Sequence, residues 1–403
     1  MLSYKLEAAQ QNSNDDSDTT LRVLFATGGF FAFAGSSNRF KQYFRRMPTL
    51  GIHPVVATTP PLRRKSLGNT KDCSPMRGLL RWAEDDNVPV LSINTFGESL
   101  LVRRLMLFLL VYAMALTNRD IRVVHMLQQT KLKTFPWTML LRMFPVVKIL
   151  SITKDYDLRW GRVKSWLQRR QFDSYDAIIC QSEDQRNLLS KLGVKADILI
   201  IPNGVDTERF CPLLTAKSKR ELRKQIELPQ EELIFLYVGS VQPRKGTDIL
   251  LEAWQKMLEE GIVAHLYIIG PRFDLKNPKW VDFTAAINRL MEDPGMKDSV
   301  TFHGYKPNIS DYLQAVDAFV FPSENEGVPN AVLEAMASGL PCVLTPFFQH
   351  STQLGQPGQH FIFAERNADA VAKSLLRVAR DPEGTRLTFG DQARRLMVTT
   401  MSM

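Results

Sequence analysis

Short apolar segments recur along the chain, separated by longer stretches with the spacing of amphipathic helices. In the first half these segments are Val23–Ala26, Val55–Thr58, Val88–Ile93, Val123–Met126, Val146–Ile152, Ala177–Cys180 and Ile198–Ile201. Strands that are apolar on both faces are typical of a parallel sheet covered by helices on both sides. The first half therefore predicts a doubly wound α/β domain.

A second series of apolar segments follows Cys211–Glu232, a stretch of mixed charge that we expect to be a linker with one helix. The predicted strands are Leu233–Val238, Ala264–Ile269, Val300–Phe302, Ala318–Phe321, Cys342–Thr345 and His360–Phe363. Thr247–Leu258 and Ala368–Ala379 are examples of the helices expected between them. The pattern predicts two tandem Rossmann-like domains, 21–205 and 206–403, after a polar, disordered tail at 1–20.

Composition excludes several classes of protein. A hydrophobic content of 44% and a charged content of 23% over 403 residues are typical of a globular protein. The four cysteines lie far apart and outside any metal-binding spacing, so we expect neither a disulfide framework nor a zinc site. This cysteine usage fits a reducing cytoplasm, and the first residues lack the features of a secretory signal.

The longest apolar run and the distribution of charge bear on partners. Leu105–Leu116 has 12 residues, whereas a helix that spans a bilayer needs roughly 20. We therefore predict a buried helix here, with membrane contact or a hydrophobic acceptor groove as the alternative. Residues 1–200 hold the excess of Lys and Arg, which favours an anionic partner, such as phosphates or an acidic lipid surface. The basic clusters lack interleaved aromatic residues, so we expect no nucleic acid, and we expect a cytoplasmic protein that lies peripherally on the inner face of the membrane.

The segment Ser323–Val343 holds two glutamates in a setting that favours ligand binding. Glu326 should lie in a loop after a strand, and Glu334 about one turn inside a helix that begins at Pro329. Free backbone N–H groups at a helix start bind anions, and a carboxylate accepts hydrogen bonds from vicinal sugar hydroxyls. The alternative is a solvated Glu326 and a Glu334 at a helix end. Because ligands of such folds bind at the carboxyl ends of strands, the functional interpretation is favoured.

One further loop follows the first strand of each predicted domain. In the second domain, Arg244 and Lys245 precede a predicted helix, where two adjacent cations suit a pyrophosphate and a solvated basic turn is the alternative. In the first domain, Gly28 and Gly29 either let backbone approach a phosphate closely or only form a tight turn. The sequence has no dinucleotide fingerprint, no P-loop and no cluster among its six histidines.

Four segments of the second half share one order and spacing: "IIPNGVDTERF", "VGSVQPRKGTDILLEAW", "VTFHGYKPNISDYLQAVDAFVFPS" and "ENEGVPNAVLEAMASGLPCV". In these segments the chain resembles the family 4 retaining glycosyltransferases, which have the two-domain GT-B fold. The first half matches more loosely, through its Gly-Gly opening and "DAIICQSEDQRNLL". The resemblance implies transfer of a sugar from a UDP-, GDP- or ADP-sugar to a glycan, lipid-linked or polysaccharide acceptor, with retention at the anomeric carbon.

The resemblance also implies roles for individual residues, with donor binding on the second domain and acceptor binding on the first. Glu334 would hold the ribose hydroxyls, and Glu326 would contact the donor sugar near the reacting centre. Arg244 and Lys245 would neutralise the leaving diphosphate, as a divalent metal does in other transferases, so we expect no metal ion or other cofactor. The remaining expected donor-binding residues are Gly327, Val328, Pro329, Asn330, Gly239, Gly28 and Gly29.

The chain departs from the family's pattern at three places. The usual Gly-Arg before the Lys-Gly is Gly-Ser here, so Arg244 would supply the second cation. His125 is followed two positions later by leucine instead of the usual second histidine, and Lys154 stands where a histidine is common. His125 and Lys154 are the acceptor-side candidates, with a structural role for Lys154 as the alternative. These departures motivate a second hypothesis, a non-catalytic or degenerate nucleotide-sugar-binding GT-B protein.

Overall fold

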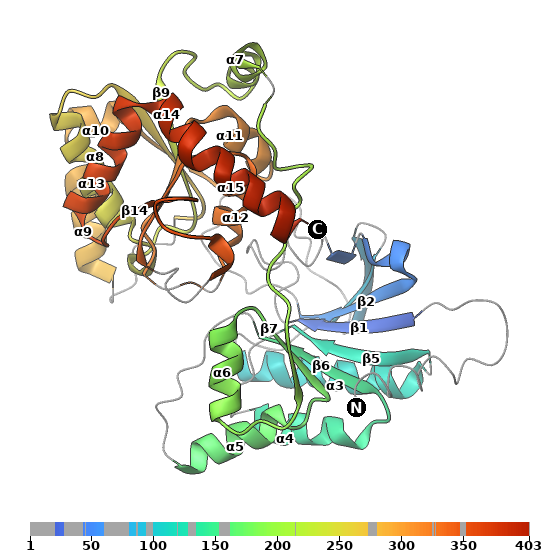
Figure 1. The fold of residues 1–403 in the computed structure, drawn as a ribbon. Coiled ribbons are helices and arrows are strands. Elements are labelled where there is room, and N and C mark those ends of the chain that lie inside the picture. Colours follow the sequence, from blue (N-terminus) through green and yellow to red (C-terminus); the bar gives the residue numbers. More distant parts are fainter. Residues whose placement is uncertain are drawn as a thin grey trace. The chain divides into compact units, whose positions relative to one another are not determined.

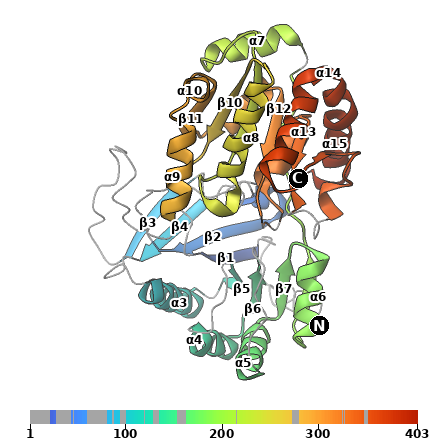
Figure 2. The same cartoon turned by 90° about the vertical axis from the view of Figure 1, so that its left-hand side faces the viewer.

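The chain divides into two compact units, 1–201 and 202–403, and each contains one sheet packed against helices (Figure 1, Figure 2). The boundary therefore lies between Ile201 and Pro202, whereas the sequence placed it after residue 205. The predicted tail at 1–20 lies outside the described residues. The computed structural model describes residues 21–27, 43–44, 46–59, 80–85, 88–93, 100–118, 120–127, 134–152, 162–213, 215–272, 280–324, 326, 328–346 and 352–402.

The first unit contains an eight-stranded sheet in the order β3-β4-β2-β1-β5-β6-β7-β8. Its strands are β1 (Leu21–Thr27), β2 (Ile52–Thr58), β3 (Leu80–Asp85), β4 (Val88–Ile93), β5 (Ile121–Met126), β6 (Val147–Ser151), β7 (Ala177–Cys180) and β8 (Asp197–Ile200). Every neighbouring pair is parallel except β3 and β4. The predicted parallel sheet is confirmed, and β3 is an additional antiparallel edge strand that the apolar pattern did not indicate.

Alternation along the strands gives this sheet a separate core on each face. On β1, Leu24 and Ala26 belong to a cluster that includes Phe108 of helix α3 (Leu100–Thr117), whereas Val23 and Phe25 pack with Phe44 in another. Residues on opposite faces of a strand alternate, so both faces are covered. The other described helices of the unit are α4 (Phe135–Leu140), α5 (Arg162–Phe172), α6 (Glu183–Lys191) and the short turns η1 (Met47–Leu50) and η3 (Leu141–Met143).

Helix α3 contains the longest apolar run of the sequence. The predicted helix is confirmed, but its burial is one-sided, because Leu107 and Val111 are buried whereas Leu109 and Leu116 are exposed. Within the described ranges, no helix has the length and apolarity needed to cross a bilayer.

The second unit contains a six-stranded sheet in the order β11-β10-β9-β12-β13-β14, and all its pairs are parallel. Its strands are β9 (Leu233–Val238), β10 (Ala264–Ile269), β11 (Val300–Gly304), β12 (Ala318–Phe321), β13 (Cys342–Leu344) and β14 (Ile362–Phe363). Its main helices are α7 (Ala216–Gln225), α8 (Thr247–Glu259), α9 (Val281–Leu290), α10 (Pro294–Ser299), α11 (Ile309–Ala315), α12 (Asn330–Ala337), α13 (Ala368–Arg380), α14 (Pro382–Thr385) and α15 (Asp391–Leu396).

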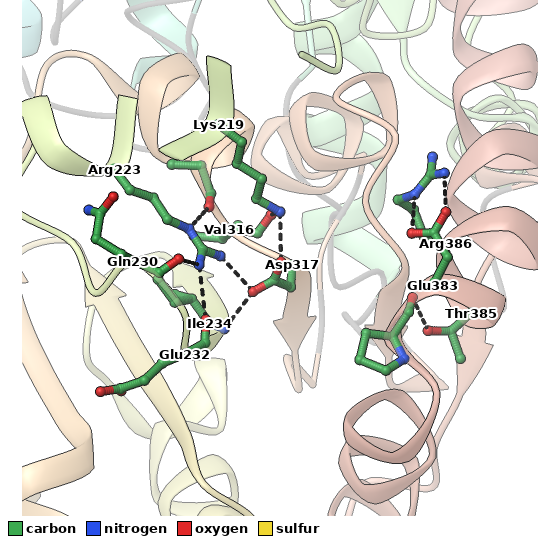
Figure 3. A network of polar contacts seen from close by, with 12 residues as sticks. Lys219, Arg223, Gln230, Glu232, Ile234, Val316, Asp317, Glu383, Thr385 and Arg386 are labelled. Carbon is green, nitrogen blue, oxygen red and sulfur yellow. Dashed lines mark hydrogen bonds and ion pairs between the residues drawn. The ribbon is translucent and has the colours of Figure 1, made fainter. Parts of the chain in front are cut away.

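Helix α7 lies in the stretch that was expected to be a linker with one helix. The helix is present, but a buried polar network fixes it to the amino ends of β9 and β12 (Figure 3). Arg223 Nη2 and Lys219 Nζ lie 2.7 and 2.6 Å from the two carboxylate oxygens of Asp317, and the backbone N–H of Ile234 donates to Asp317 Oδ2 at 2.7 Å. The segment is therefore an integral part of the second unit.

Candidate functional site

The candidate site lies at the carboxyl ends of β9 and β12, which are neighbours in the second sheet. Arg244 and Lys245 end the short turn η4 (Pro243–Lys245) between β9 and α8, as the sequence predicted. The two loops are joined because the backbone N–H of Glu324 donates to Arg244 O at 2.9 Å, and Ser323 Oγ lies 3.3 Å from the same carbonyl oxygen. Sheet topology thus brings together residues that are about eighty positions apart in the chain.

Three side chains converge on one oxygen of Glu326. Arg244 Nη1 lies 2.5 Å and Lys245 Nζ 2.6 Å from Glu326 Oε1, and Ser323 Oγ donates to that oxygen at 2.9 Å. All three of these contacts involve Oε1. The carboxylate and the two cations that were predicted as catalytic residues therefore form one cluster, with an unusual concentration of donors on one atom.

Burial and the neighbouring charges shift the pKa of Glu326 in opposite directions. Burial disfavours its ionisation, but Lys245, Arg244 and the Ser323 hydroxyl outweigh burial and hold the pKa of Glu326 below its usual value. The side chain of Lys245 is 13% exposed and lies 4.5 Å from the centre of the Phe321 ring, whereas the Arg244 side chain is 43% exposed. At neutral pH the site therefore holds one carboxylate between two cations.

Residues that the sequence analysis did not identify hold the two loops together. Arg366 donates from Nε to Pro322 O at 3.2 Å and from Nη2 to Pro243 O at 3.1 Å, so one guanidinium holds both loops. At Gly246 the backbone has φ of 67°, and an added Cβ would lie 2.2 Å from Pro322 O. Only glycine fits this position, because any side chain would force the loops apart.

Glu334 occupies the second turn of α12, where the sequence placed it. The helix begins at Asn330, with Pro329 as an extended N-cap residue, so the expectation that Pro329 is the first helical residue was wrong by one position. Burial raises the pKa of Glu334 to about 7, with Arg209 acting in the opposite direction. In the part of the chain that the structure describes, no hydrogen bond reaches its carboxylate, which leaves both oxygens available to hydroxyl donors.

Asn203 fixes the start of α12. Its buried side chain donates from Nδ2 to Val328 O at 2.7 Å and lies 3.1 Å from Asn330 Oδ1. Asn203 belongs to the "IIPNGVDTERF" segment, so its position in that motif was the signal that could have identified it. At Gly239 an added Cβ would lie 2.7 Å from the Tyr237 hydroxyl, which explains a glycine there by packing.

In the first unit, His125 lies one residue before the carboxyl end of β5. Its Nε2 lies 2.8 Å from Ser151 Oγ, and its ring packs against Phe25 at a centroid distance of 5.1 Å. Burial lowers the pKa of His125 to about 3, so the imidazole is neutral at physiological pH. The role of His125 stays a prediction. Gly28, Gly29, Lys154 and Gly327 lie outside the described residues.

Metal-ligating side chains are dispersed in the described ranges. These ranges contain no group of three or more His, Cys, Asp or Glu side chains placed to hold a metal ion. The described cysteines, Cys180, Cys211 and Cys342, are free thiols.

Two family models match successive parts of the chain. The model described as Glycosyltransferase Family 4 matches residues 33–209, and the model described as Glycosyl transferases group 1 matches residues 218–396. The second match contains Arg244, Lys245, Glu326 and Glu334. The chain belongs to the group 1 glycosyltransferases.

Curated relatives of this group 1 family member are similar over about half of its length. The chain is 28% identical over 222 residues to the UDP-Gal:alpha-D-GlcNAc-diphosphoundecaprenol alpha-1,3-galactosyltransferase of Escherichia coli. This match covers 54% of the present chain and 55% of the E. coli protein. The chain is 29% identical over 215 residues to the lipopolysaccharide core biosynthesis mannosyltransferase LpsB of Rhizobium meliloti, covering 51% and 53%. The matches thus span about half the length of each relative.

Solved structures establish the fold of this group 1 family member. Sucrose-phosphate synthase from Thermosynechococcus elongatus superimposes with a TM-score of 0.72 over 95% of both chains at 18% identity. HepE of Anabaena, solved with UDP and glucose, gives a TM-score of 0.69 at 14% identity, covering 95% of this chain and 96% of that one. The predicted GT-B fold, with two Rossmann-like parallel sheets, is confirmed.

Proposed function

We propose that the chain is a retaining glycosyltransferase that moves a sugar from a nucleotide-sugar to a glycan, lipid-linked or polysaccharide acceptor. The observation that carries the proposal is the cluster in which Arg244, Lys245 and Ser323 converge on Glu326. The named substrate of the E. coli relative, a sugar on diphosphoundecaprenol, and its UDP-sugar donor support this substrate class.

The cluster has the charges that a diphosphate leaving group requires. In the described structure, Arg244 and Lys245 face the carboxylate of Glu326. A nucleotide-sugar would bring phosphate oxygens to these cations, and Glu326 would then accept hydrogen bonds from hydroxyls of the donor sugar. When the bond between the anomeric carbon and the phosphate oxygen breaks, its electron pair passes to the diphosphate, whose growing charge the two cations stabilise.

The same charges underlie the proposed independence from metal ions. Two preorganised cations supply the neutralisation that a divalent ion gives elsewhere. Retention follows if the acceptor hydroxyl attacks from the face that the diphosphate leaves and transfers its proton to the departing phosphate oxygen. The proposal therefore requires no cofactor beyond the two substrates.

Glu334 and the start of α12 would hold the nucleoside diphosphate part of the donor, with the ribose at Glu334 and a phosphate at the helix N-terminus. The Glu334 carboxylate has no partner among the described residues and suits the two ribose hydroxyls. Val328, Pro329 and Asn330 lie at the N-terminus of α12, where the helix dipole favours an anion. The UDP in the HepE structure favours a uridine nucleotide as the first to be tested, before GDP- and ADP-sugars.

The proposed setting is the cytoplasm, with the protein peripheral on the inner face of the membrane. The excess of positive charge in the first half and the lipid-linked acceptor of the E. coli relative support this placement.

A donor panel tests the proposal. The full-length protein is incubated with UDP-, GDP- and ADP-sugars in EDTA, and release of free sugar is followed, with the anomeric configuration of the product determined by NMR. We expect slow hydrolysis of one donor class, with retention, that EDTA does not change. Turnover restored only by a divalent ion would contradict metal independence, and tight binding of a donor without turnover under any acceptor would support the non-catalytic alternative.

A further inference from the structure

Helices α3, α4 and α5 form a continuous layer on one side of the first sheet, where Figure 2 shows them in a row. Tyr112 of α3 donates a hydrogen bond to Trp137 O of α4, and its ring stacks on Phe144 at 5.1 Å. Gln171 of α5 donates to Thr134 Oγ1, just before α4, at 3.1 Å. The outer sides of the three helices therefore belong to one surface.

The outer side of α5 is apolar where a solvated helix would be polar. Its inner side buries Gln168, Gln171 and Phe172. Val163 and Trp166, three positions apart and so on the same side of the helix, are 72% and 49% exposed. Two large apolar side chains thus face outward while two glutamines are buried, which is the reverse of an ordinary amphipathic surface helix.

The exposed apolar surface continues onto the neighbouring helices. Met143, at the end of η3, is 78% exposed. On α3, Leu109 and Leu116 lie seven positions apart on one side and are both exposed. We call this surface the α3–α5 face and define its apolar residues as Leu109, Leu116, Leu140, Met143, Val163 and Trp166.

The charged residues within these helices all have one sign, and Asp173, directly after α5, lies 3.9 Å from Arg169. The segments α3, α4, η3 and α5 contain no Asp or Glu. Their cations are Arg103, Arg104, Arg142, Arg162, Lys164, Arg169 and Arg170. Arg142 and Arg170 are exposed, and the Arg170 guanidinium lies 5.2 Å from the centre of the Trp166 ring. Lys164 is also exposed, in the first turn of α5, and lies at the edge of the face because it is four positions before Gln168. Apolar side chains with a tryptophan, on helices whose charged residues are all cations, match the chemistry of an interfacial membrane surface.

We infer that the α3–α5 face binds the surface of a bilayer that contains anionic lipids. The apolar side chains enter the boundary between headgroups and acyl chains, Trp166 lies at headgroup level, and Arg142, Lys164 and Arg170 contact lipid phosphates. An exposed apolar patch is typical of a binding surface, and the predominantly positive charge of this face would repel a second copy of itself. This inference gives the proposed membrane association a definite surface and does not require sugar transfer.

Vesicle flotation with the full-length protein tests the inference. The vesicles contain phosphatidylcholine with or without phosphatidylglycerol, at low and high salt. We expect binding only to the anionic vesicles, and weaker binding at high salt. The triple variant R142E/K164E/R170E should lose binding by on the order of 100-fold, because each cation near an anionic surface contributes about 1 kcal/mol. Trp166→Ser should weaken binding about tenfold, through loss of interfacial burial.

Matched variants in the second unit distinguish a specific role of the α3–α5 face from a general effect of net charge or of exposed apolar side chains. R289E/K297E/K373E makes the same change in net charge at exposed positions of the second unit, and Val263→Ser removes an apolar side chain there that is more exposed than Trp166. Both controls should bind vesicles like the wild type. Equal losses in the controls and the α3–α5 variants, or wild-type binding by the triple variant, would overturn the inference.

Two further measurements keep the outcome unambiguous. Circular dichroism and thermal unfolding verify that each variant is folded, and donor hydrolysis without lipid should be unchanged by R142E/K164E/R170E. If Trp166→Ser leaves vesicle binding intact but changes a dimer into a monomer by sedimentation, the face is a contact between copies of this chain and the inference is wrong. Failure of hydrolysis with intact vesicle binding would instead count against the proposed function alone.

Discussion

The second unit holds a carboxylate between two cations at each end of its sheet. The two arrangements differ in how the hydrogen-bonding and ion-pair partners are distributed over the two carboxylate oxygens. At the amino end, Asp317 has partners on both oxygens, and Arg223 also donates to the backbone carbonyls of Ala315, Gln230 and Glu232 (Figure 3). At the carboxyl end, three donors converge on a single oxygen, Glu326 Oε1.

This difference separates a structural network from a ligand site. Buried charges stabilise a fold only when their hydrogen-bonding capacity is satisfied, and the Asp317 network meets that condition. The Glu326 cluster concentrates charge on one atom beside a half-exposed Arg244, so an incoming anion could rearrange it with little structural change. The same residue types thus serve opposite purposes at the two ends of one sheet.

We expect the largest loss of stability from a substitution that breaks the Asp317 network at the amino end of the sheet. Asp317→Ala leaves the buried Arg223 and the half-buried Lys219 without their carboxylate, so we expect a loss of about 3–5 kcal/mol in the free energy of unfolding. Glu326→Ala should lose less, about 2 kcal/mol, because it leaves only Lys245 poorly solvated, whereas Arg244 is 43% exposed. Urea denaturation of the two variants measures the difference. Equal losses would mean that both clusters are structural.

A second prediction concerns the affinity for a nucleoside diphosphate, with UDP as the first probe. Lys245→Met should raise Kd about 100-fold and Arg244→Met about tenfold, since a buried cation contributes more to an ion pair than an exposed one. Lys219→Met removes a lysine at the opposite end of the sheet and should leave Kd unchanged while lowering stability. Calorimetric titration gives the three values, and an effect of Lys219→Met on Kd equal to that of Lys245→Met would contradict the assignment.

A smaller effect follows from the raised pKa of Glu334. Its folded pKa of about 7 exceeds the value of an exposed glutamate, so its stabilising contribution is complete below the unfolded pKa near 4.5 and is lost as the pH rises to about 7. Glu334→Gln, which cannot ionise, should therefore be more stable than the wild type at about pH 8, by about 3 kcal/mol, and equal to it at about pH 4.

Thermal or urea unfolding across this pH range checks the prediction for Glu334. A stability difference that does not grow between about pH 4.5 and pH 7 would show that the carboxylate is not held in a poorly solvated site. Ribose hydroxyls favour the ionised form, so nucleotide affinity of the wild type should fall as the pH is lowered through about 7.

Much of the fold follows from local pattern, because a strand buried on both faces must be apolar throughout. The β12 strand was predicted at its observed bounds for this reason, whereas β3 was missed because three of its six residues are charged. Helix α7 was expected in a linker, since its sequence is highly charged. Only the tertiary structure supplies Asp317, far along the chain, as the partner that makes it part of the unit.

The candidate site was predictable to the extent that its residues lie in short motifs. Glu326, Arg244 and Lys245 lie in loops that follow strands, and Glu334 lies one turn inside the next helix, so their placement near the carboxyl edge of the sheet could be inferred. The pairing of both cations with Glu326 could not, because it depends on β9 and β12 being neighbours. Arg366 carried no signal, since it contacts two backbone carbonyls, and the sequence at those positions does not encode such contacts.

The most direct test of the donor site compares two properties of Glu326→Ala. If Glu326 holds Arg244 and Lys245 in the free protein and contacts the sugar during transfer, the variant should lose turnover of its nucleotide-sugar by about 100-fold. It should nevertheless bind the free nucleoside diphosphate at least as tightly as the wild type, because the two cations are no longer neutralised by the carboxylate. Retained turnover, or a parallel loss of turnover and nucleoside diphosphate affinity in a folded variant, would contradict the account.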